Sequence, residues 1–210
     1  MLTLWRSKFF ALSLGEIYFN YNNKCTKKIS NDELTNIKWH PPDKDFVELN
    51  FDGSVAGVKA VDSFAIREHN EILIAGGALN LDIALIFEVE AKGLREGLMF
   101  ALRKGVLKIM VEGDSKLVIQ VVQGMCSMLW NLEHTIEDIK WTPTKFSIIY
   151  WNHIFREANF VTDTFACQGL LIIGCHLWEH HVPPFALDAL CFDSGRNDCI
   201  RGISMYGSFG

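Results

Sequence analysis

The sequence predicts an α/β domain with a five-stranded mixed sheet, in which three antiparallel strands precede two parallel ones and helices flank the sheet. Three runs with strand character follow one another between residues 46 and 79, joined by short links. Apolar residues then recur at helical spacing from about residue 84. Two more apolar runs, 106–112 and 146–154, each follow a helical stretch, which is the kind of connection that parallel strands need.

The three leading strands are expected to form an antiparallel meander. In the stretch VELNFDGSV, which begins at Val47, apolar and polar residues alternate with the period of a strand. The next two runs are AVDSFAIRE (60–68) and EILIAGGAL (71–79). Only His69 and Asn70 separate them, which predicts a tight turn between neighbouring strands.

Four helices are expected after the meander. The first spans about 84–104, with its apolar residues on one stripe. The second, KLVIQVVQGM, opens after the GDS tripeptide at 113–115 and ends at Gly124. The others are expected at 132–141 and 156–170, on either side of the last strand. The stripe of the first helix consists of Phe87, Ala91, Leu94, Leu98, Ala101 and Leu102.

Composition divides the chain into three segments. Residues 1–38 end in a polar, broken stretch, which predicts an irregular leader or linker. The domain is expected to span 39–172 and to begin at WHPP, where two adjacent prolines exclude a helix. Residues 173–210 contain Pro183-Pro184 and several glycines, so this C-terminal extension is expected to be poorly structured.

Charge and hydropathy bound the functional classes. The chain has 210 residues, 49% of them hydrophobic, which is enough for a buried core in one domain. Its formal net charge is −5, with the acidic excess in 39–172. A dedicated nucleic-acid binder usually carries a basic patch, so tight binding by charge alone is not expected. An active site whose acidic groups hold metal ions stays compatible with this charge.

The sequence specifies no compartment. Glu16 interrupts the apolar N-terminal run, which argues against a signal peptide, and no apolar stretch reaches the length of a membrane span. Nucleus or cytosol is the default expectation, and a monomer is expected. The six cysteines form no C-x-x-C pair, which favours free intracellular thiols over a zinc site. The residues that come nearest to a zinc set, without finger-like spacing, are Cys175, His180, His181 and Cys191.

Three aspartates have ordinary structural explanations when each is taken alone. Asp52 is expected to end the first strand, where an Asp-Gly pair is typical of a turn. Asp114 follows the fourth strand, where aspartate is a preferred helix N-cap. Asp163 lies near the start of the last helix, where an acid favours the positive end of the helix dipole.

A glutamate in the first helix is harder to explain. Glu90 lies on or near the buried stripe, where an acid is costly unless it is paired or bound to metal. Its neighbour Glu88 has an ordinary surface partner in Lys92, four residues later. If the first and fourth strands are neighbours, Asp52 and Asp114 meet at one edge of the sheet. Converging carboxylates repel one another unless cations intervene, and hard oxygen ligands select Mg²⁺ or Mn²⁺.

Five sequence pieces stand in order between residues 39 and 170: WHPP leading into LNFDGS, then FAIREHNEIL, EAKGLREGL, VEGDS and HIFREANFVTD. In these pieces the chain resembles the ribonuclease H-like superfamily, most closely the plant retroelement-derived "reverse transcriptase-like" RNase H (type 1) domains. The resemblance implies an RNase H-like fold. It also implies that the four acids of the family stand here at Asp52, Glu90, Asp114 and Asp163.

The resemblance further implies a metal-dependent endoribonuclease. In that family the four acids hold two Mg²⁺ (or Mn²⁺) ions, the first aspartate bridges both, and water attacks the RNA strand of an RNA–DNA hybrid. Selection of the RNA strand would come from contacts to its 2′-hydroxyl groups, for which Gly53, Ser54 and Asn159 are the candidate positions. The chain departs from the family at Gly93, where alanine is usual, and it lacks the basic handle of well-studied members. His153 lies on a strand and not in the loop that carries a catalytic histidine in those enzymes.

Two alternatives to an enzyme remain open. One is an RNase H-fold module that binds nucleic acid without cutting it, and the other is a retroelement relic or scaffold with protein partners or none. A module that only binds should not need the Asp52 carboxylate, so metal dependence separates it from the enzyme. Phosphate contacts would make its affinity fall steeply as salt rises, which separates it from the relic.

Overall fold

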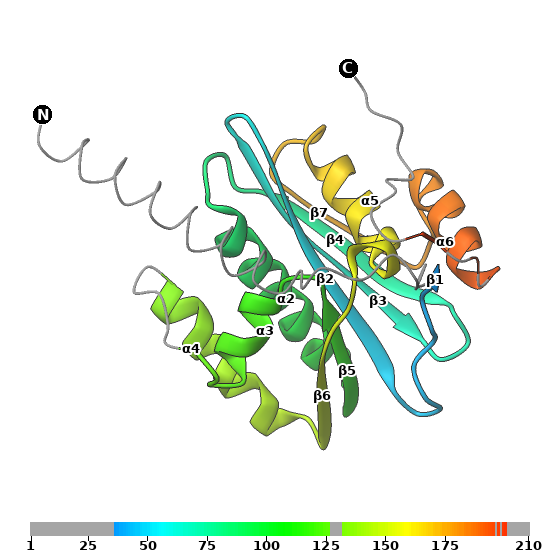
Figure 1. Ribbon diagram of the computed structural model, residues 1–210, viewed down its shortest axis with the longest axis horizontal. Coiled ribbons are helices and arrows are strands. Elements are labelled where there is room, and N and C mark those ends of the chain that lie inside the picture. The colour runs from blue at the N-terminus through cyan, green and yellow to red at the C-terminus, as the bar shows by residue number, and fades with distance from the viewer. Residues whose placement is uncertain (1–35, 127–131, 196, 198, 201–210) are drawn as a thin grey trace, which may run out of the picture. The chain divides into compact units, whose positions relative to one another are not determined.

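The computed structural model of the chain describes residues 36–126, 132–195, 197 and 199–200. A six-stranded mixed sheet lies at its centre, in the strand order β6-β5-β2-β3-β4-β7 (Figure 1). The α/β class and the mixed sheet are confirmed, but the sheet has six strands where five were expected. Its strands are β2 (Val47–Ala56), β3 (Lys59–Glu68), β4 (Leu73–Asn80), β5 (Lys108–Gly113), β6 (Ile148–His153) and β7 (Cys175–Glu179).

The antiparallel meander is confirmed, since β3 pairs antiparallel with both β2 and β4. The later strands are parallel, with β5 beside β2 and β6 beside β5. However, β2 continues past Asp52 and pairs with β3 as far as Ala56, opposite Lys59. The chain turns at Gly57, whose φ of +62° suits glycine. The expectation that Asp52 ends a strand is therefore wrong, because the Asp-Gly pair lies inside β2.

Helices cover both faces of the sheet (Figure 1). Phe64 and Ala65 are consecutive on β3 and therefore point to opposite faces. Phe64 lies against Gly97 of α2, whereas Ala65 is buried among side chains from α5 and α6. Hence α2 covers one face, with α3 and α4 packed beside it, and α5 and α6 cover the other. These helices are α2 (Ile86–Arg103), α3 (Lys116–Val122), α4 (Glu133–Trp141), α5 (Phe160–Gly169) and α6 (Leu187–Ser194).

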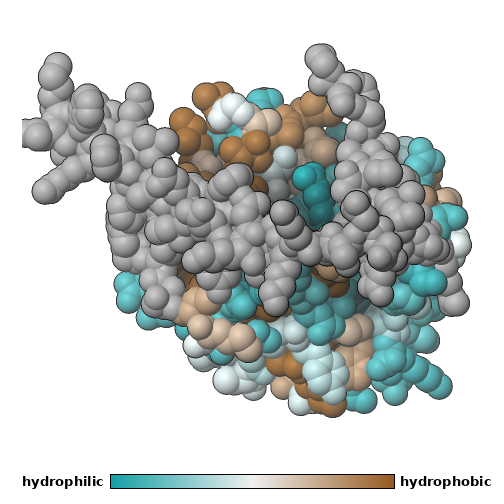
Figure 2. Space-filling view, viewed as in Figure 1, coloured by the Kyte–Doolittle hydropathy of each residue, from teal (hydrophilic) through white to brown (hydrophobic). Residues whose placement is uncertain are grey.

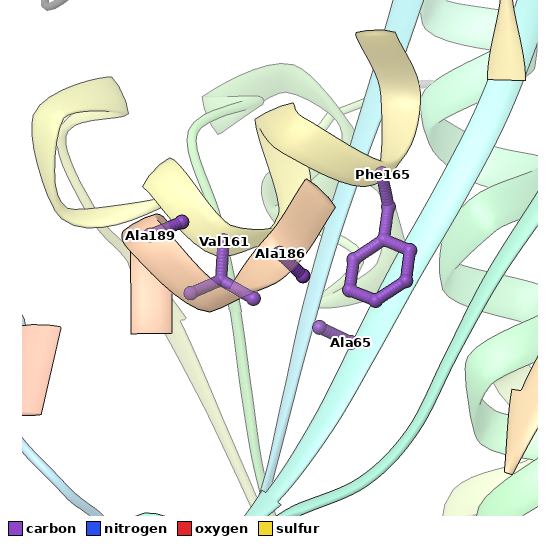
Figure 3. Close-up of a cluster of buried hydrophobic side chains, with 5 residues drawn as sticks. All are labelled: Ala65, Val161, Phe165, Ala186 and Ala189. Atoms are coloured by element: carbon purple, nitrogen blue, oxygen red, sulfur yellow. The ribbon is translucent and has the colours of Figure 1, made fainter. Parts of the chain in front are cut away.

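The expectation of a poorly structured extension at 173–210 is wrong for the described part of that segment. β7 pairs antiparallel with β4 and becomes an edge strand of the sheet. Its Trp178 packs against Phe165 of α5 at a ring-centroid distance of 5.4 Å, and Phe185 packs against the same ring at 5.3 Å. Figure 3 shows Ala189 of α6 and Ala186 beside Val161 of α5, in a buried cluster that also contains Phe165 and Ala65. Segments this short carry no clear period in sequence, and burial of aromatic rings fixes them instead.

The leader expected at 1–38 lies outside the described residues up to residue 35. β1 (Asn36–Ile37) pairs antiparallel with β8 (Cys199–Ile200), so two segments far apart in sequence meet there. Among the helices of the described part, none combines the length and the apolar character that a membrane span requires.

One end of the sheet exposes apolar side chains. Figure 2 shows a hydrophobic group at its upper edge, over the β2–β3 hairpin and the link from α5 to β7. Val58, Leu171 and Ile173 are exposed in these segments. The Lys59 ammonium joins the two segments by donating to the Leu170 carbonyl at 2.7 Å. Exposed apolar residues of this kind are common on protein surfaces and do not by themselves imply a partner.

One buried acid, separate from the four acids that the sequence singles out, is expected to make the stability of the fold depend on pH. The Asp62 side chain, on β3, is 2% exposed, and its Oδ2 atom has no hydrogen-bond partner. Burial, followed by the charge of Glu96, raises the pKa of Asp62 to about 7. Because the folded state holds the proton of such an acid more tightly than the unfolded state does, the fold is more stable at low pH than at high pH. This extra stability is lost as pH rises from about 4, the unfolded value, through about 7.

Asp62→Asn is expected to remove this pH dependence. At pH 8 the variant should be more stable than the wild type by up to about 4 kcal/mol, because a neutral amide replaces a buried charge. At pH 4 the two proteins should unfold alike. Urea unfolding at both pH values tests this, with the exposed Asp43→Asn as a control that should show no such gain. A wild type as stable as Asp62→Asn at pH 8 would contradict the explanation.

Candidate active site

Four acidic side chains from four elements come together where β5 ends. Asp52 stands on β2, one residue beyond Phe51, which is the last β2 residue paired with β5. Asp114 directly follows the end of β5 at Gly113, Glu90 comes from α2, and Asp163 from α5. Burial raises the pKa of Asp52 well above its usual value, and the charges of Asp114, Asp163 and Glu90 raise it further. The four acids that the sequence singles out are therefore one electrostatic unit.

Glu90 reaches this unit because α2 packs very closely on the sheet. A Cβ atom at Gly93 would lie 2.5 Å from the Ser63 carbonyl oxygen and 3.1 Å from that of Asp52. Only glycine permits this approach, and it places Glu90, one helical turn earlier, beside β2. The Glu90 carboxylate accepts a 2.5 Å hydrogen bond from the Ser115 hydroxyl, which is buried. Sequence reasoning treated Ser115 only as part of a helix start, and no local pattern reveals its contact with a residue 25 positions away.

Gly93→Ala is expected to destabilise the protein, although alanine is the better helix former by about 1 kcal/mol. The added methyl group would meet backbone atoms of β2 and β3, which cannot turn aside as a side chain can. We expect a net loss of about 1–3 kcal/mol in the free energy of unfolding. Denaturant unfolding measures it, and a gain in stability would show that α2 can move away from the sheet without penalty.

Glu88 has a capping role that the sequence did not indicate. It accepts a hydrogen bond from the Leu85 backbone N–H at 3.0 Å and so caps the start of α2. An acid in the first helical turn also suits the helix dipole. Glu88 is therefore a structural neighbour of Glu90 with a separate role, which makes it a useful control for the four acids.

Asp114 is not a capping residue. The N-cap position of α3 belongs to Ser115, and the Asp114 Oδ1 atom is buried without a hydrogen-bond partner. Burial raises the pKa of Asp114 to about 6, against the opposing charge of Arg156. His153, the last residue of β6, is exposed, and its Nε2 lies 3.1 Å from the Asp114 carbonyl oxygen. Partial burial lowers the pKa of His153.

Asp163 lies in the first turn of α5, as expected, but the helix starts later than predicted. A 3₁₀ turn, η3 (Arg156–Ala158), comes first, and the chain breaks at Asn159 before α5 begins. Asn159 is 1% exposed and donates to the Phe51 carbonyl at 3.0 Å. It thereby fastens the start of α5 to β2 beside Asp52. This contact makes Asn159 a positioning residue, and its buried Oδ1 atom has no hydrogen-bond partner.

The two remaining candidate positions lie on β2. The Gly53 N–H donates to the Asp52 carboxylate at 2.8 Å and holds its orientation. Gly53 also admits α2, because a Cβ there would lie 2.5 Å from Val89. Ser54 is half-buried on the same strand, opposite Val61. Of the positions considered for strand contacts, these two stay nearest the surface.

The donor chemistry of the site fits hard divalent cations. It consists of carboxylates, which Mg²⁺ and Mn²⁺ prefer, and it includes the buried oxygen of Asp114 that lacks a partner. Across the described residues, however, no three His, Cys, Asp or Glu side chains are already gathered into a group that could hold an ion. The other acids have partners: Asp52 accepts from Gly53, Glu90 from Ser115, and Asp163 from Arg156. Ion binding would thus require some of these side chains to reorient.

Comparison with known proteins agrees with the fold. The family described as "Reverse transcriptase-like" matches residues 50–169. A comparison with curated proteins gives no match. Among solved structures, the chain is similar to RNase H1 from the halophilic archaeon Halobacterium salinarum NRC-1, with 23% identity and a TM-score of 0.56 over 60% of this chain and 97% of that one. Similarity extends to the N-terminal RNase H domain of Rv2228c from Mycobacterium tuberculosis, with 22% identity and a TM-score of 0.57 over 60% and 93% of the two chains.

A third similar structure contains nucleic acid. LC11-RNase H1, solved in complex with an RNA/DNA hybrid, shares 17% identity with the chain at a TM-score of 0.55, over 59% of this chain and 96% of that one. At these identities the likeness establishes a shared fold. The RNase H-like fold expected from the sequence is confirmed.

Proposed function

The chain belongs to the reverse transcriptase-like family, and from this premise we propose that it binds RNA–DNA hybrids and hydrolyses their RNA strand in a metal-dependent reaction. The observation that carries the proposal is the convergence of four carboxylates from β2, α2, the end of β5 and α5, where burial and then the charges of the other three acids raise the pKa of Asp52. Such repulsion is unfavourable unless cations neutralise it. Support for the substrate class comes from the hybrid bound to the similar LC11-RNase H1.

In this proposal Asp52, Glu90, Asp114 and Asp163 would hold two Mg²⁺ or Mn²⁺ ions. When bound, the ions would activate a water molecule and stabilise the leaving oxygen at phosphorus. The chain's own groups set the geometry of the acids. The Gly53 N–H orients Asp52, the Ser115 hydroxyl orients Glu90, and Asn159 fixes the helix that carries Asp163. Backbone groups at Gly53 and Ser54 are the proposed contacts for the strand.

A specific observation favours a second candidate, a module that binds hybrids without cutting them. Asp163 is already paired with Arg156, and no three candidate ligands of the described chain are gathered around one point. Such a module would keep the fold and the strand contacts and would lack turnover.

Cleavage of a labelled RNA–DNA hybrid by the purified full-length protein tests both candidates. Reactions with Mg²⁺, with Mn²⁺ and with EDTA are compared, and single-stranded RNA and duplex DNA serve as substrate controls. The proposal predicts cutting of the RNA strand of the hybrid, with either metal and not with EDTA. If the folded protein binds the hybrid and leaves it intact, the proposed hydrolysis is contradicted and the binding module is supported.

A further inference from the structure

The acidic site contains its own positive charge. The Arg156 Nη2 atom donates to the Asp163 Oδ1 atom at 2.7 Å. The charge of Asp163, and to a lesser degree those of Asp52 and Asp114, raise the pKa of the Arg156 guanidinium. In turn, Arg156 opposes the rise in the pKa of Asp114. One guanidinium is therefore coupled electrostatically to three of the four acids.

The two partners of this ion pair differ in their freedom to move. The Asp163 side chain is 12% exposed, whereas the Arg156 side chain is 72% exposed. Arg156 comes from η3, outside α5, and reaches the acids from the solvent side. The guanidinium can leave Asp163 by rotating its own side chain, without opening the core or moving α5.

A carboxylate that accepts a hydrogen bond from a guanidinium is a weaker ligand for a metal ion, because both cations need the same oxygen. The guanidinium also binds phosphate, with the same planar pattern of donors that suits carboxylate. A nucleic-acid backbone that approaches the acids therefore offers Arg156 an alternative partner. The phosphate would then draw the Arg156 guanidinium away from Asp163 and leave the Asp163 carboxylate free to bind an ion.

We propose that Arg156 is an internal counter-ion that competes with divalent cations for the four-acid site and transfers to a strand phosphate when nucleic acid binds. This inference rests on the proposed function, since it assigns Arg156 a place at the same site. Its consequence is reciprocal coupling: hybrid raises the affinity for the ion, and ion raises the affinity for hybrid by the same factor. An exposed ion pair with only a structural role would contribute little to stability and would not link the two ligands.

Titration of Mn²⁺ into the full-length protein, by calorimetry at low ionic strength and without nucleic acid, tests the competition directly. Arg156→Gln is expected to bind Mn²⁺ roughly fivefold to tenfold more tightly than the wild type. The difference should shrink as monovalent salt rises, because Arg156 is exposed. The matched control is Arg95→Gln, since Arg95 also pairs with acids, Asp138 and Glu96, on α4 and α2. It should bind Mn²⁺ as the wild type does, and equal or weaker binding by Arg156→Gln would overturn the proposal.

The second arm repeats the titration with a 2′-O-methyl RNA–DNA hybrid, which presents the phosphates and resists cleavage. The hybrid should increase the Mn²⁺ affinity of the wild type several-fold and that of Arg156→Gln much less; an equal increase in both would overturn the phosphate transfer. These readouts are independent of cleavage. If Arg156→Gln binds Mn²⁺ more tightly but the wild type cleaves no hybrid, only the proposed function is contradicted. If the wild type cleaves the hybrid but Arg156→Gln binds Mn²⁺ with unchanged affinity, only this inference is contradicted. No Mn²⁺ binding by either protein would overturn both.

Discussion

Asp52→Asn is expected to abolish metal-dependent cleavage of an RNA–DNA hybrid and to leave the protein folded. Burial, and then the charges of the other three acids, raise the pKa of Asp52, and the proposed metal site would need its negative charge. A neutral amide of the same shape would not supply that charge. The expected loss in the cleavage rate is on the order of a thousandfold or more. Initial rates with Mg²⁺ and with Mn²⁺, measured beside the wild type, give this number.

The same substitution should not weaken the fold at neutral pH. Burial and neighbouring charge raise the pKa of Asp52, so its contribution to stability is present at low pH and lost as pH rises through the folded-state value. Asparagine carries no charge at any pH, so the variant does not lose this stability as pH rises. Asp52→Asn should therefore be at least as stable as the wild type at pH 8. Glu88→Gln is the matched control, because glutamine still accepts from the Leu85 N–H, and its cleavage rate should stay within about twofold. Equal cleavage by Asp52→Asn and the wild type would remove Asp52 from the proposed mechanism.

The sequence predicted those parts of the fold that repeat a period over many residues. The meander, the long helix and the strand-to-helix alternation each extend far enough to show periodicity. They allow β5 to lie beside β2 without determining it, and the structure shows this pairing, which brings Asp52 and Asp114 to one place. Single-residue signals were less reliable. The Asp-Gly pair in β2 is locally typical of a turn, yet pairing with β3 keeps it extended to Ala56.

Contacts between distant segments had no sequence signal. Ser115 holds Glu90 although 25 residues separate them, and no helical or strand spacing relates the two. Arg156 lies seven residues before Asp163, but the chain breaks at Asn159 between them, so the pair does not belong to one helix. The burial of the polar residues of β2 also had no sequence signal, because alternation along a strand does not show what covers its polar side. In the structure that side is buried, and Glu48 is 0% exposed. The cover comes from α5, α6 and the segment before β2, whose positions only tertiary packing decides.

The second large effect is expected on stability, from Arg67→Ala. Arg67 is 1% exposed and forms ion pairs with Glu48 at 3.2 Å and with Asp193 at 2.6 Å. It also donates to Asn50 at 2.8 Å, and its guanidinium carbon lies 3.8 Å from the centre of the Trp39 ring. One side chain thus joins β3 to β2, to α6 and to the segment before β2. Its removal would leave two buried carboxylates without their cation, which typically costs about 3–5 kcal/mol.

The pH dependence of this loss distinguishes charge from packing. Burial raises the pKa of Glu48 to about 8, although Arg67 opposes the rise, and burial raises that of Asp193 to about 6. Both carboxyls can become neutral in the folded state at pH 5, so Arg67→Ala should lose less stability there than at pH 8.5, where burying two charges adds to the lost contacts.

Denaturant unfolding at the two pH values measures this difference, with Arg95→Ala as the matched control. Arg95 is 34% exposed, far more than Arg67, and pairs with Asp138, so its removal should change stability by less than about 1 kcal/mol at either pH. Should Arg67→Ala lose equal stability at pH 5 and pH 8.5, packing of the long side chain against Trp39 would account for the effect, and the buried charges would not. A larger loss at pH 8.5 would mean that the face of the sheet carrying Asp52 depends on Arg67 for its neutrality.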